Sequence, residues 1–219
     1  QNWYLGETLI TGIGQGYIQT TPIQLCLMTA QLANGGFKIY PKIVLDPNQE
    51  TVEEIKSKML SEVETNEEDI KSRFNSGIFF GDESKKYQAL FRNKENVKFV
   101  LNAMFRSTNE VYGTSFSSRI EDPKYQFAGK TGTAQVKRIT EAERELDLET
   151  NQIPYKQRDH AWFIAFGPYK KPRYAMSILV EHGGSGSKAA APIAKKLFKL
   201  VIDRHEMREK LKKNNSVKI

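Results

Sequence analysis

Two apolar runs joined by a proline-containing turn constrain the fold of this chain most strongly. Residues 161–166 and 174–180 are short, apolar and rich in aromatic or β-branched side chains, which is typical of buried strands. The turn between them, residues 167–172, contains one glycine and two prolines. We therefore expect an antiparallel hairpin, with a third strand formed by residues 125–136.

The first helix is expected after the Thr-Thr-Pro sequence of residues 20–22, because threonine is a good N-cap and proline suits the first helical position. The Asn-Gly-Gly of residues 34–36 should end it. Residues 37–44 are then predicted to form a short strand, at an edge or a bend because Pro41 cannot donate a backbone hydrogen bond.

Two more helices are expected. The apolar residues of 94–106 recur with helical spacing behind a candidate N-cap, Asn93. A final helix should begin near Ala189 and pack back on the sheet. Its predicted inner face consists of Ile193, Leu197, Leu200 and Val201. This order of elements predicts an α+β fold in which helices cover an antiparallel sheet.

Composition excludes several classes of protein. The chain has 219 residues, no apolar run long enough to span a bilayer, and a single cysteine, Cys26, so it has no internal disulfide framework. We interpret Cys26 as a core residue rather than a nucleophile. Residues 188–219 contain ten Lys or Arg against three Asp or Glu, which accounts for the net charge of +7.

This basic end is interpreted as a solvated, partly frayed tail. The alternative is attraction to an anionic membrane surface or an anionic polymer. Nucleic acid is disfavoured because no aromatic residue lies within the final basic cluster. Two charged segments, residues 46–73 and 137–158, are interpreted as surface insertions. Thr140 and Glu143 have the spacing of a capping box within the second of them.

The motif with chemical content is Ala-Gly-Lys-Thr-Gly-Thr-Ala-Gln-Val at residues 128–136. In a regular strand, Thr131 and Thr133 share one face and Lys130 takes the other. Two hydroxyl groups beside an ammonium make a receptor for a carboxylate, and an edge N–H could serve as an oxyanion donor. Gly132 allows close approach of a substrate. The Lys-Thr-Gly tripeptide alone is weak evidence, since chance produces such a sequence in roughly one chain in ten of this length.

The wider sequence gives the tripeptide its context. Several blocks in this order resemble class B penicillin-binding proteins, and in particular the penicillin-binding protein 2 branch of elongation transpeptidases. They are residues 3–8, 12–17, 20–24, 129–135, 159–163 and 181–184. The resemblance covers residues 1–45 and 94–202, and it implies the penicillin-binding/serine β-lactamase-like fold.

The resemblance implies acyl transfer without a cofactor. In the family, a serine attacks the penultimate D-Ala of a peptidoglycan stem peptide, and β-lactams mimic that substrate. Lys130 would supply positive potential and join the proton relay. Thr131 and Thr133 would hold the carboxylate, with Gly132 beside them, and the N–H of Thr133 would form half of the oxyanion hole.

The family's nucleophile motif, Ser-x-x-Lys, should precede the Lys-Thr-Gly element. The one match, residues 185–188, follows it, so we interpret Ser185 as part of a loop or a helix N-cap, with a nucleophile as the alternative. Residues 107–109, Ser-Thr-Asn, imitate the second family element, although they lie at the end of a predicted helix. We expect residues 1–202 to be the C-terminal part of a transpeptidase domain without its nucleophile, followed by a basic tail at residues 203–219.

Two histidines remain. Asp159 and His160 are expected to orient groups near the cleft. A metal site built with Glu181 and His182 is disfavoured, because each acid–histidine pair is adjacent in sequence and would point to opposite faces of a strand.

The resemblance also implies a cellular location and a set of binding partners for the complete protein. The complete protein should be periplasmic and anchored to the inner membrane by an upstream segment. Its expected partners are the stem peptide, β-lactams, the N-terminal half of the domain and membrane proteins of an elongation complex. The rival hypotheses are a non-catalytic β-lactam sensor and a β-lactamase relative.

Overall fold

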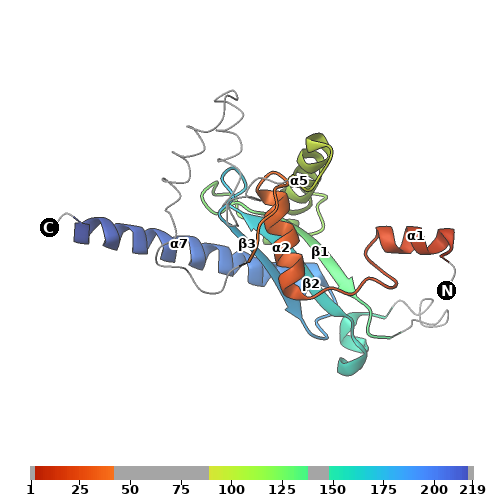
Figure 1. Ribbon diagram of the computed structural model, residues 1–219. Coiled ribbons are helices and arrows are strands. Elements are labelled where there is room, and N and C mark those ends of the chain that lie inside the picture. The colour runs from red at the N-terminus through yellow and green to blue at the C-terminus, as the bar shows by residue number, and fades with distance from the viewer. Residues whose placement is uncertain (1–2, 42–88, 138–147, 217–219) are drawn as a thin grey trace.

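The computed structural model describes residues 3–41, 89–137 and 148–216. Its centre is a three-stranded antiparallel sheet in the order β1-β2-β3, as Figure 1 shows. The strands are β1 (Ala128–Ala134), β2 (His160–Gly167) and β3 (Tyr174–Val180). The predicted hairpin and the antiparallel sheet are therefore confirmed.

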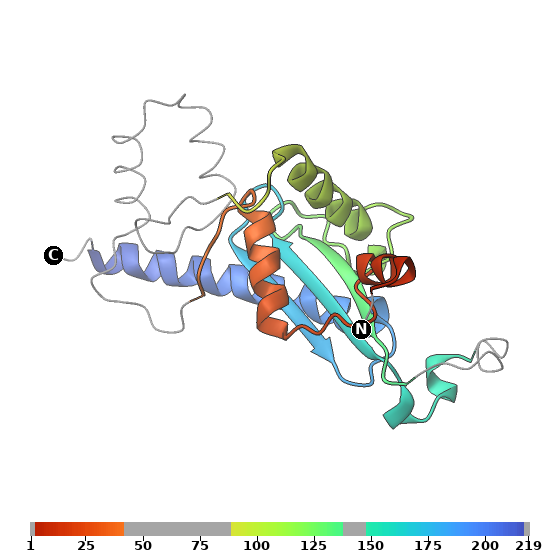
Figure 2. The same cartoon turned by 45° about the vertical axis from the view of Figure 1, so that its right-hand side comes forward.

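Helices cover both faces of this sheet. One face carries α2 (Pro22–Ala33) and α5 (Lys94–Asn109), and the other carries α7 (Ala191–Ser216), as Figures 1 and 2 show. The α+β prediction is confirmed. An additional helix, α1 (Leu5–Gly12), was not expected from the sequence, and none of its residues is buried.

Short helical turns complete the chain. They are η2 (Phe116–Ser118), η3 (Thr150–Gln152), η4 (Tyr155–Gln157) and a single π-helical turn, η5 (Gly186–Ala190), which leads directly into α7.

The predicted helix starts are confirmed. The Thr21 hydroxyl accepts the Gln24 N–H at 3.3 Å, and the Gln24 side chain accepts the Thr21 N–H at 2.8 Å, so the two form a capping box in front of Pro22. The Asn93 side chain caps α5 by accepting the Glu95 N–H at 2.8 Å. Both helices thus begin where their sequence signals place them.

The main core lies between the sheet and α7. Phe127, Phe163 and Phe198 are fully buried there. The Phe127 and Phe198 rings stack with their centroids 4.9 Å apart, and Phe127 meets Phe163 edge-on at 6.2 Å. These contacts hold α7 against β1 and β2.

The predicted inner face of the last helix is wrong. The structure buries Ala194, Phe198 and Ile202, which follow an i, i+4, i+8 spacing. The four residues expected there are 37–65% exposed: Ile193, Leu197, Leu200 and Val201. The rings of Phe127 and Phe163 occupy most of the space beneath α7. The stripe that faces them therefore contains a small residue, Ala194, and one Phe that stacks on the Phe127 ring, Phe198.

Other expectations differ in part. Phe37 forms a single β-bridge with Ala89, and residues 38–41 adopt no strand, while 42–44 lie outside the described residues. Beyond residue 203, α7 continues as helix to Ser216, where a frayed tail was expected. Residues 46–73 and the capping box at Thr140 fall outside the described part of the chain.

Cys26 lies half-buried on α2, where its Sγ atom is 3.5 Å from the Ala175 carbonyl oxygen. Burial raises the pKa of the Cys26 thiol, which suits a packing residue rather than a nucleophile. Among the helices that the structure describes, none combines the length and apolar character needed to cross a bilayer.

Candidate active-site edge

The free edge of β1 is the centre of the candidate site. In an antiparallel strand, each residue's N–H and C=O point to the same side, and successive residues alternate. The carbonyls of Phe127, Gly129, Thr131 and Thr133 all accept hydrogen bonds from groups other than the neighbouring strand. The N–H groups of Thr131 and Thr133 therefore also face away from β2.

The Lys130 side chain comes to the same edge. By register, Lys130 lies opposite Ile164 and Thr131 opposite Phe163, so the two side chains start on different faces of the sheet, as expected. The ammonium nevertheless reaches round the edge, since Lys130 Nζ lies 2.8 Å from the Thr131 carbonyl oxygen and 3.4 Å from its Oγ1. A positive charge and the hydroxyl of Thr131 are thereby brought together.

The other face of β1 is closely covered at Thr131. A Cβ atom on Gly186 would lie 2.4 Å from the Trp162 carbonyl oxygen and 3.2 Å from the Thr131 Cβ. The start of η5 can therefore approach the sheet only because residue 186 is glycine. This contact leaves Thr131 half-buried while Thr133 is exposed.

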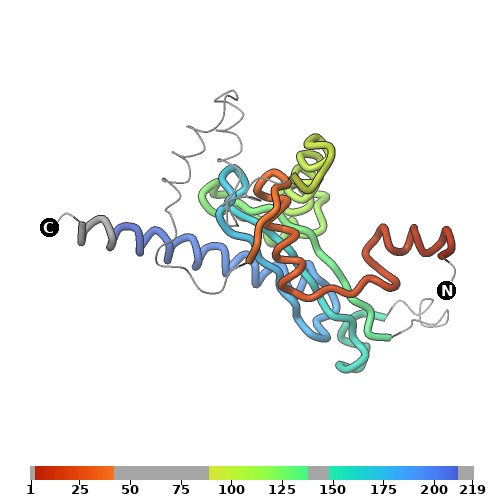
Figure 3. Tube along the Cα trace, in the orientation of Figure 1, coloured from red at the N-terminus to blue at the C-terminus, as the bar shows by residue number. Residues whose placement is uncertain are grey.

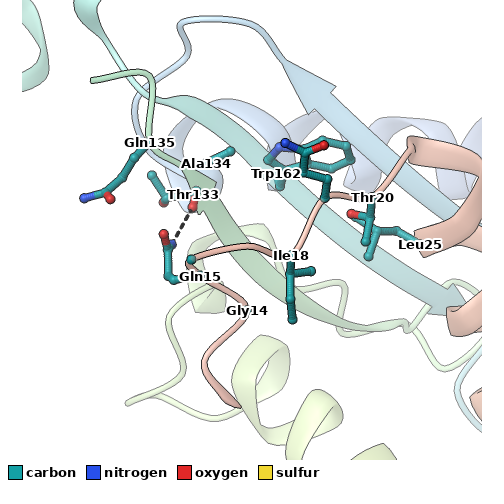
Figure 4. A pocket seen from close by; sticks show the side chains of 11 residues that line it. Gly14, Gln15, Ile18, Thr20, Leu25, Thr133, Ala134, Gln135 and Trp162 are labelled. Atoms are coloured by element: carbon teal, nitrogen blue, oxygen red, sulfur yellow. Dashed lines mark hydrogen bonds between the residues drawn. The ribbon is translucent and has the colours of Figure 1, made fainter. Parts of the chain in front are cut away.

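A cavity of about 620 Å³ opens beside the end of β1 (Figure 4). Its walls are formed by β1, by β2 and by the segment between α1 and α2. This segment passes the end of β1 (Figure 3). The lining includes Gly14, Gln15, Ile18, Thr133, Gln135 and Trp162. Gln15 Nε2 donates to the Thr133 carbonyl oxygen at 3.1 Å, the bond drawn in Figure 4.

A second cavity, of about 230 Å³, is also lined by Thr133. Asp159 and Ser185 line it together with Thr133. Asp159 Oδ1 accepts the Val136 N–H at 3.1 Å, and its carbonyl accepts the Gly184 N–H at 2.8 Å. Asp159 thus fixes the chain after β1 against the turn that follows β3.

His160 and His182 come together, a pairing that sequence reasoning did not find. Their ring centroids are 4.7 Å apart, and His160 Nδ1 accepts the His182 N–H at 2.9 Å. His182 has a left-handed backbone, with φ 55°, and its Nδ1 lies 3.0 Å from the Arg158 carbonyl oxygen. The pair joins β2 to the turn after β3, beside the cavity that Asp159 lines.

The segments that resemble the other two family motifs, residues 107–109 and 185–188, make local or packing contacts. Thr108 and Asn109, in the last turn of α5, donate to carbonyls of β1 and of the residue before it: Thr108 Oγ1 to Gly129 at 3.4 Å and Asn109 Nδ2 to Phe127 at 2.9 Å. Ser185 is the N-cap residue of η5, and its Oγ lies 3.0 Å from Ser187 Oγ.

No hydrogen bond joins Ser185 to Lys188 within the described residues. A serine nucleophile needs such an adjacent base. Among the residues that the structure describes, no group of three or more His, Cys, Asp and Glu side chains could hold a metal ion.

Gln15 is the residue of this site that sequence reasoning missed. It lies 118 positions before Thr133, so no local pattern connects them. The available signal was its position between Gly14 and Gly16, which adopt φ values of 78° and 77°. Two such glycines indicate a loop held in a specific shape.

Comparisons with known proteins agree with this geometry. The model of the penicillin binding protein transpeptidase domain matches residues 1–199. The peptidoglycan D,D-transpeptidase MrdA of Salmonella typhimurium is 31% identical over 201 residues, and the E. coli K12 protein of the same name is 29% identical over 184. The solved structure of Pseudomonas aeruginosa PBP2 in complex with WCK 5153 is 32% identical, covers 91% of this chain and superposes with a TM-score of 0.61.

A complex between PBP2 and MreC from Helicobacter pylori contains a PBP2 chain that is 29% identical, with a TM-score of 0.57 over 91% of this chain. The present chain spans about a quarter to a third of the length of these relatives: 28% and 24% of the two MrdA proteins, and 34% and 29% of the two PBP2 chains. These relatives confirm the expected resemblance to the penicillin-binding protein 2 branch. With a family match over nearly its whole length and a sheet edge built around Lys-Thr-Gly, this chain belongs to the penicillin-binding protein transpeptidase family.

Proposed function

We propose that residues 1–202 are the C-terminal part of the transpeptidase domain of a peptidoglycan D,D-transpeptidase, which acts on D-Ala-D-Ala stem peptides in cell-wall elongation and is acylated by β-lactams. The supporting observation is the edge of β1, where the Lys130 ammonium lies against the Thr131 carbonyl oxygen and the outward-facing Thr133 lines an open cavity. A donor N–H and a cation at one edge suit a carbonyl that becomes an oxyanion.

Each motif residue has a role in this proposal. The Thr133 N–H stabilises the oxygen of the tetrahedral intermediate, and loss of such a donor typically costs about 3–4 kcal/mol of transition-state stabilisation. Lys130 supplies positive charge and takes part in proton transfer. The hydroxyls of Thr131 and Thr133 bind the terminal carboxylate of the stem peptide, and Gly132 leaves the strand open to it.

The nucleophilic serine and its lysine belong to an upstream part of the domain. The serine Oγ forms a bond to the penultimate D-Ala carbonyl carbon, the bond to the terminal D-Ala nitrogen breaks, and the serine proton passes to the departing amine. An amine of a stem peptide on a neighbouring peptidoglycan strand then attacks the acyl-enzyme carbonyl, takes the acyl group and releases the serine, which regains a proton. Asp159 and His160 orient the chain beside this cleft.

The cellular setting follows the same proposal. The complete protein would lie in the periplasm, held at the inner membrane through an upstream segment, with elongation-complex membrane proteins as partners. The Helicobacter pylori PBP2–MreC complex supports this class of partner. Residues 46–73 and 137–158 would be surface insertions of the domain, and residues 203–219 its basic C-terminal extension.

Substitution of Lys130 tests the proposal. In the full-length protein, Lys130→Ala should abolish covalent labelling by fluorescent penicillin while leaving the thermal unfolding midpoint unchanged, because the ammonium is exposed. Lys170→Ala, at an exposed lysine of the β2–β3 turn, is the matched control and should label normally. Normal labelling of the Lys130 variant would refute the assignment.

Intact-mass spectrometry tests where the nucleophile lies. The present chain, incubated with benzylpenicillin, should gain no mass, because neither Ser107 nor Ser185 is placed as an activated serine. A stoichiometric adduct on either residue would place the nucleophile in this chain and overturn the proposed order of the active site.

A further inference from the structure

The hydrogen bond from Gln15 to Thr133 occupies the edge that the proposed function requires. An extended peptide that adds to a strand edge pairs as another strand would. In such an added strand, the residue that faces Thr133 accepts the Thr133 N–H with its carbonyl oxygen and donates its own N–H to the Thr133 carbonyl oxygen. Suppose that one residue of the acyl donor places its carbonyl oxygen at the Thr133 N–H. The N–H of that donor residue then lies at the Thr133 carbonyl oxygen.

That carbonyl is already in use. Gln15 Nε2 donates to it at 3.1 Å across one wall of the 620 Å³ cavity (Figure 4). Gln15 is half-buried, whereas the glycines on either side of it are exposed, so its side chain is directed inward at the sheet edge. An incoming peptide N–H and the Gln15 carboxamide compete for one acceptor.

The segment that carries Gln15 is shaped for this contact. Both flanking glycines have positive φ, a conformation that other residues adopt at a cost. A Cβ atom on Gly16 would also lie 3.1 Å from Ile10 Cγ2 of α1. The Gln15 N–H donates to the Ile10 carbonyl oxygen at 3.1 Å, which ties the loop to α1 and fixes the position of Gln15.

We propose that Gln15 is a built-in competitor for the acyl donor: its carboxamide takes the place of the substrate N–H at Thr133 in the empty site and is displaced when the donor binds. When a donor with this N–H binds, its hydrogen bond to the Thr133 carbonyl replaces the one from Gln15. The loss of the Gln15 bond offsets part of the donor's affinity for the site. A β-lactam without an amide at this position leaves Gln15 in place. Gln15 thus sets the acylation rate only for ligands that reach the Thr133 carbonyl.

Two β-lactams separate these cases in the full-length protein. Benzylpenicillin carries a side-chain amide next to the β-lactam ring, and penicillanic acid lacks it. Gln15→Met keeps the length of the side chain and removes its donor. The second-order acylation rate of benzylpenicillin should rise about two- to tenfold, the effect of one net hydrogen bond, while that of penicillanic acid stays unchanged.

Controls make the result specific. Gln31→Met removes a similar bond, from a carboxamide of α2 to the Ile39 carbonyl oxygen at 3.4 Å, and should alter neither rate. Gln15→Asn, whose amide is one methylene too short to reach, should behave like Gln15→Met. Thermal unfolding of each variant identifies any that is misfolded.

The outcomes are distinct from those of the proposed function. Failure of benzylpenicillin to acylate the wild-type protein would refute the proposed function itself. Acylation of the wild type together with an unchanged or slower rate in both Gln15 variants would overturn the role of Gln15. An equal gain with both β-lactams would overturn it as well, since that pattern reports a loosened loop rather than competition at Thr133.

Discussion

Gly129 and Gly132 lie in the same strand, three residues apart, yet their surroundings differ. A Cβ atom on Gly129 would lie 2.4 Å from Phe163 Cζ and 2.9 Å from the Ile164 carbonyl oxygen. A Cβ atom on Gly132 would meet only the Trp162 Cβ, at 3.2 Å. The first glycine is required by the core, whereas the second has nearly enough room for a methyl group and, in the proposed function, keeps the strand open to substrate.

This contrast gives a prediction for alanine substitutions. Gly129→Ala should lower the free energy of unfolding by about 1–3 kcal/mol, because the buried Phe163 ring and the β2 backbone must move. Gly132→Ala should cost less stability and reduce acylation in the full-length protein instead. Urea denaturation and penicillin labelling measure the two effects, and an equal loss of stability in both variants would contradict the packing argument.

At the scale of single elements, the N-terminus of α2 depends on its capping box. Thr21 accepts one backbone N–H and donates its own to Gln24. Thr21→Ala should destabilise the chain by about 1 kcal/mol, the usual effect of losing an N-cap. Thr20→Ala is the control, since the Thr20 hydroxyl makes no hydrogen bond within the described residues. Equal shifts of the unfolding midpoint would show that the cap is not what stabilises α2.

The elements also show how far sequence could predict this fold. The caps at Thr21 and Asn93 and the β2–β3 hairpin depend on neighbouring residues, so local signals place them correctly. The inner face of α7 depends on which rings the sheet presents, and the sequence offers two apolar stripes without choosing between them. The contact of Phe37 with Ala89 depends on residues 52 positions apart, and a continuous strand was predicted in its place.

The same division applies to the site. Lys130, Thr131 and Thr133 are contiguous, and alternation along a strand predicts their faces. Gln15 and the His160–His182 pair are assembled by tertiary contacts over 118 and 22 positions. Spacing within the chain holds no information about such contacts.

Across the whole molecule, burial differs between the two ends of the described chain. The α7 side contains the fully buried aromatic cluster, while the opposite end of the chain presents apolar side chains to solvent: Leu5, Leu9 and Ile13 on or beside α1 are 69–80% exposed. Large exposed apolar surfaces mark binding sites. In the proposed function, the upstream part of the transpeptidase domain covers them.

The attachment of α7 to the sheet depends on the stacking of Phe198 on Phe127. Phe198 is fully buried and stacks on Phe127, whereas Leu200, two residues on, is 65% exposed. Phe198→Ala should lower the free energy of unfolding by about 3–5 kcal/mol, or abolish the cooperative transition, because it leaves a cavity under the helix. Leu200→Ala should change stability by no more than about 0.5 kcal/mol.

Urea denaturation of the two variants, followed by circular dichroism, distinguishes the two stripes of α7. A large loss with Leu200→Ala and a small loss with Phe198→Ala would mean that the helix packs through the face that the sequence alone predicted. The expected result is the reverse, because the stacked rings of Phe127 and Phe198 fix the rotation of the helix about its axis. That rotation also sets the position of η5, whose Gly186 covers Thr131 at the candidate active-site edge, so in the proposed function a weakened α7 should slow acylation in the full-length protein as well.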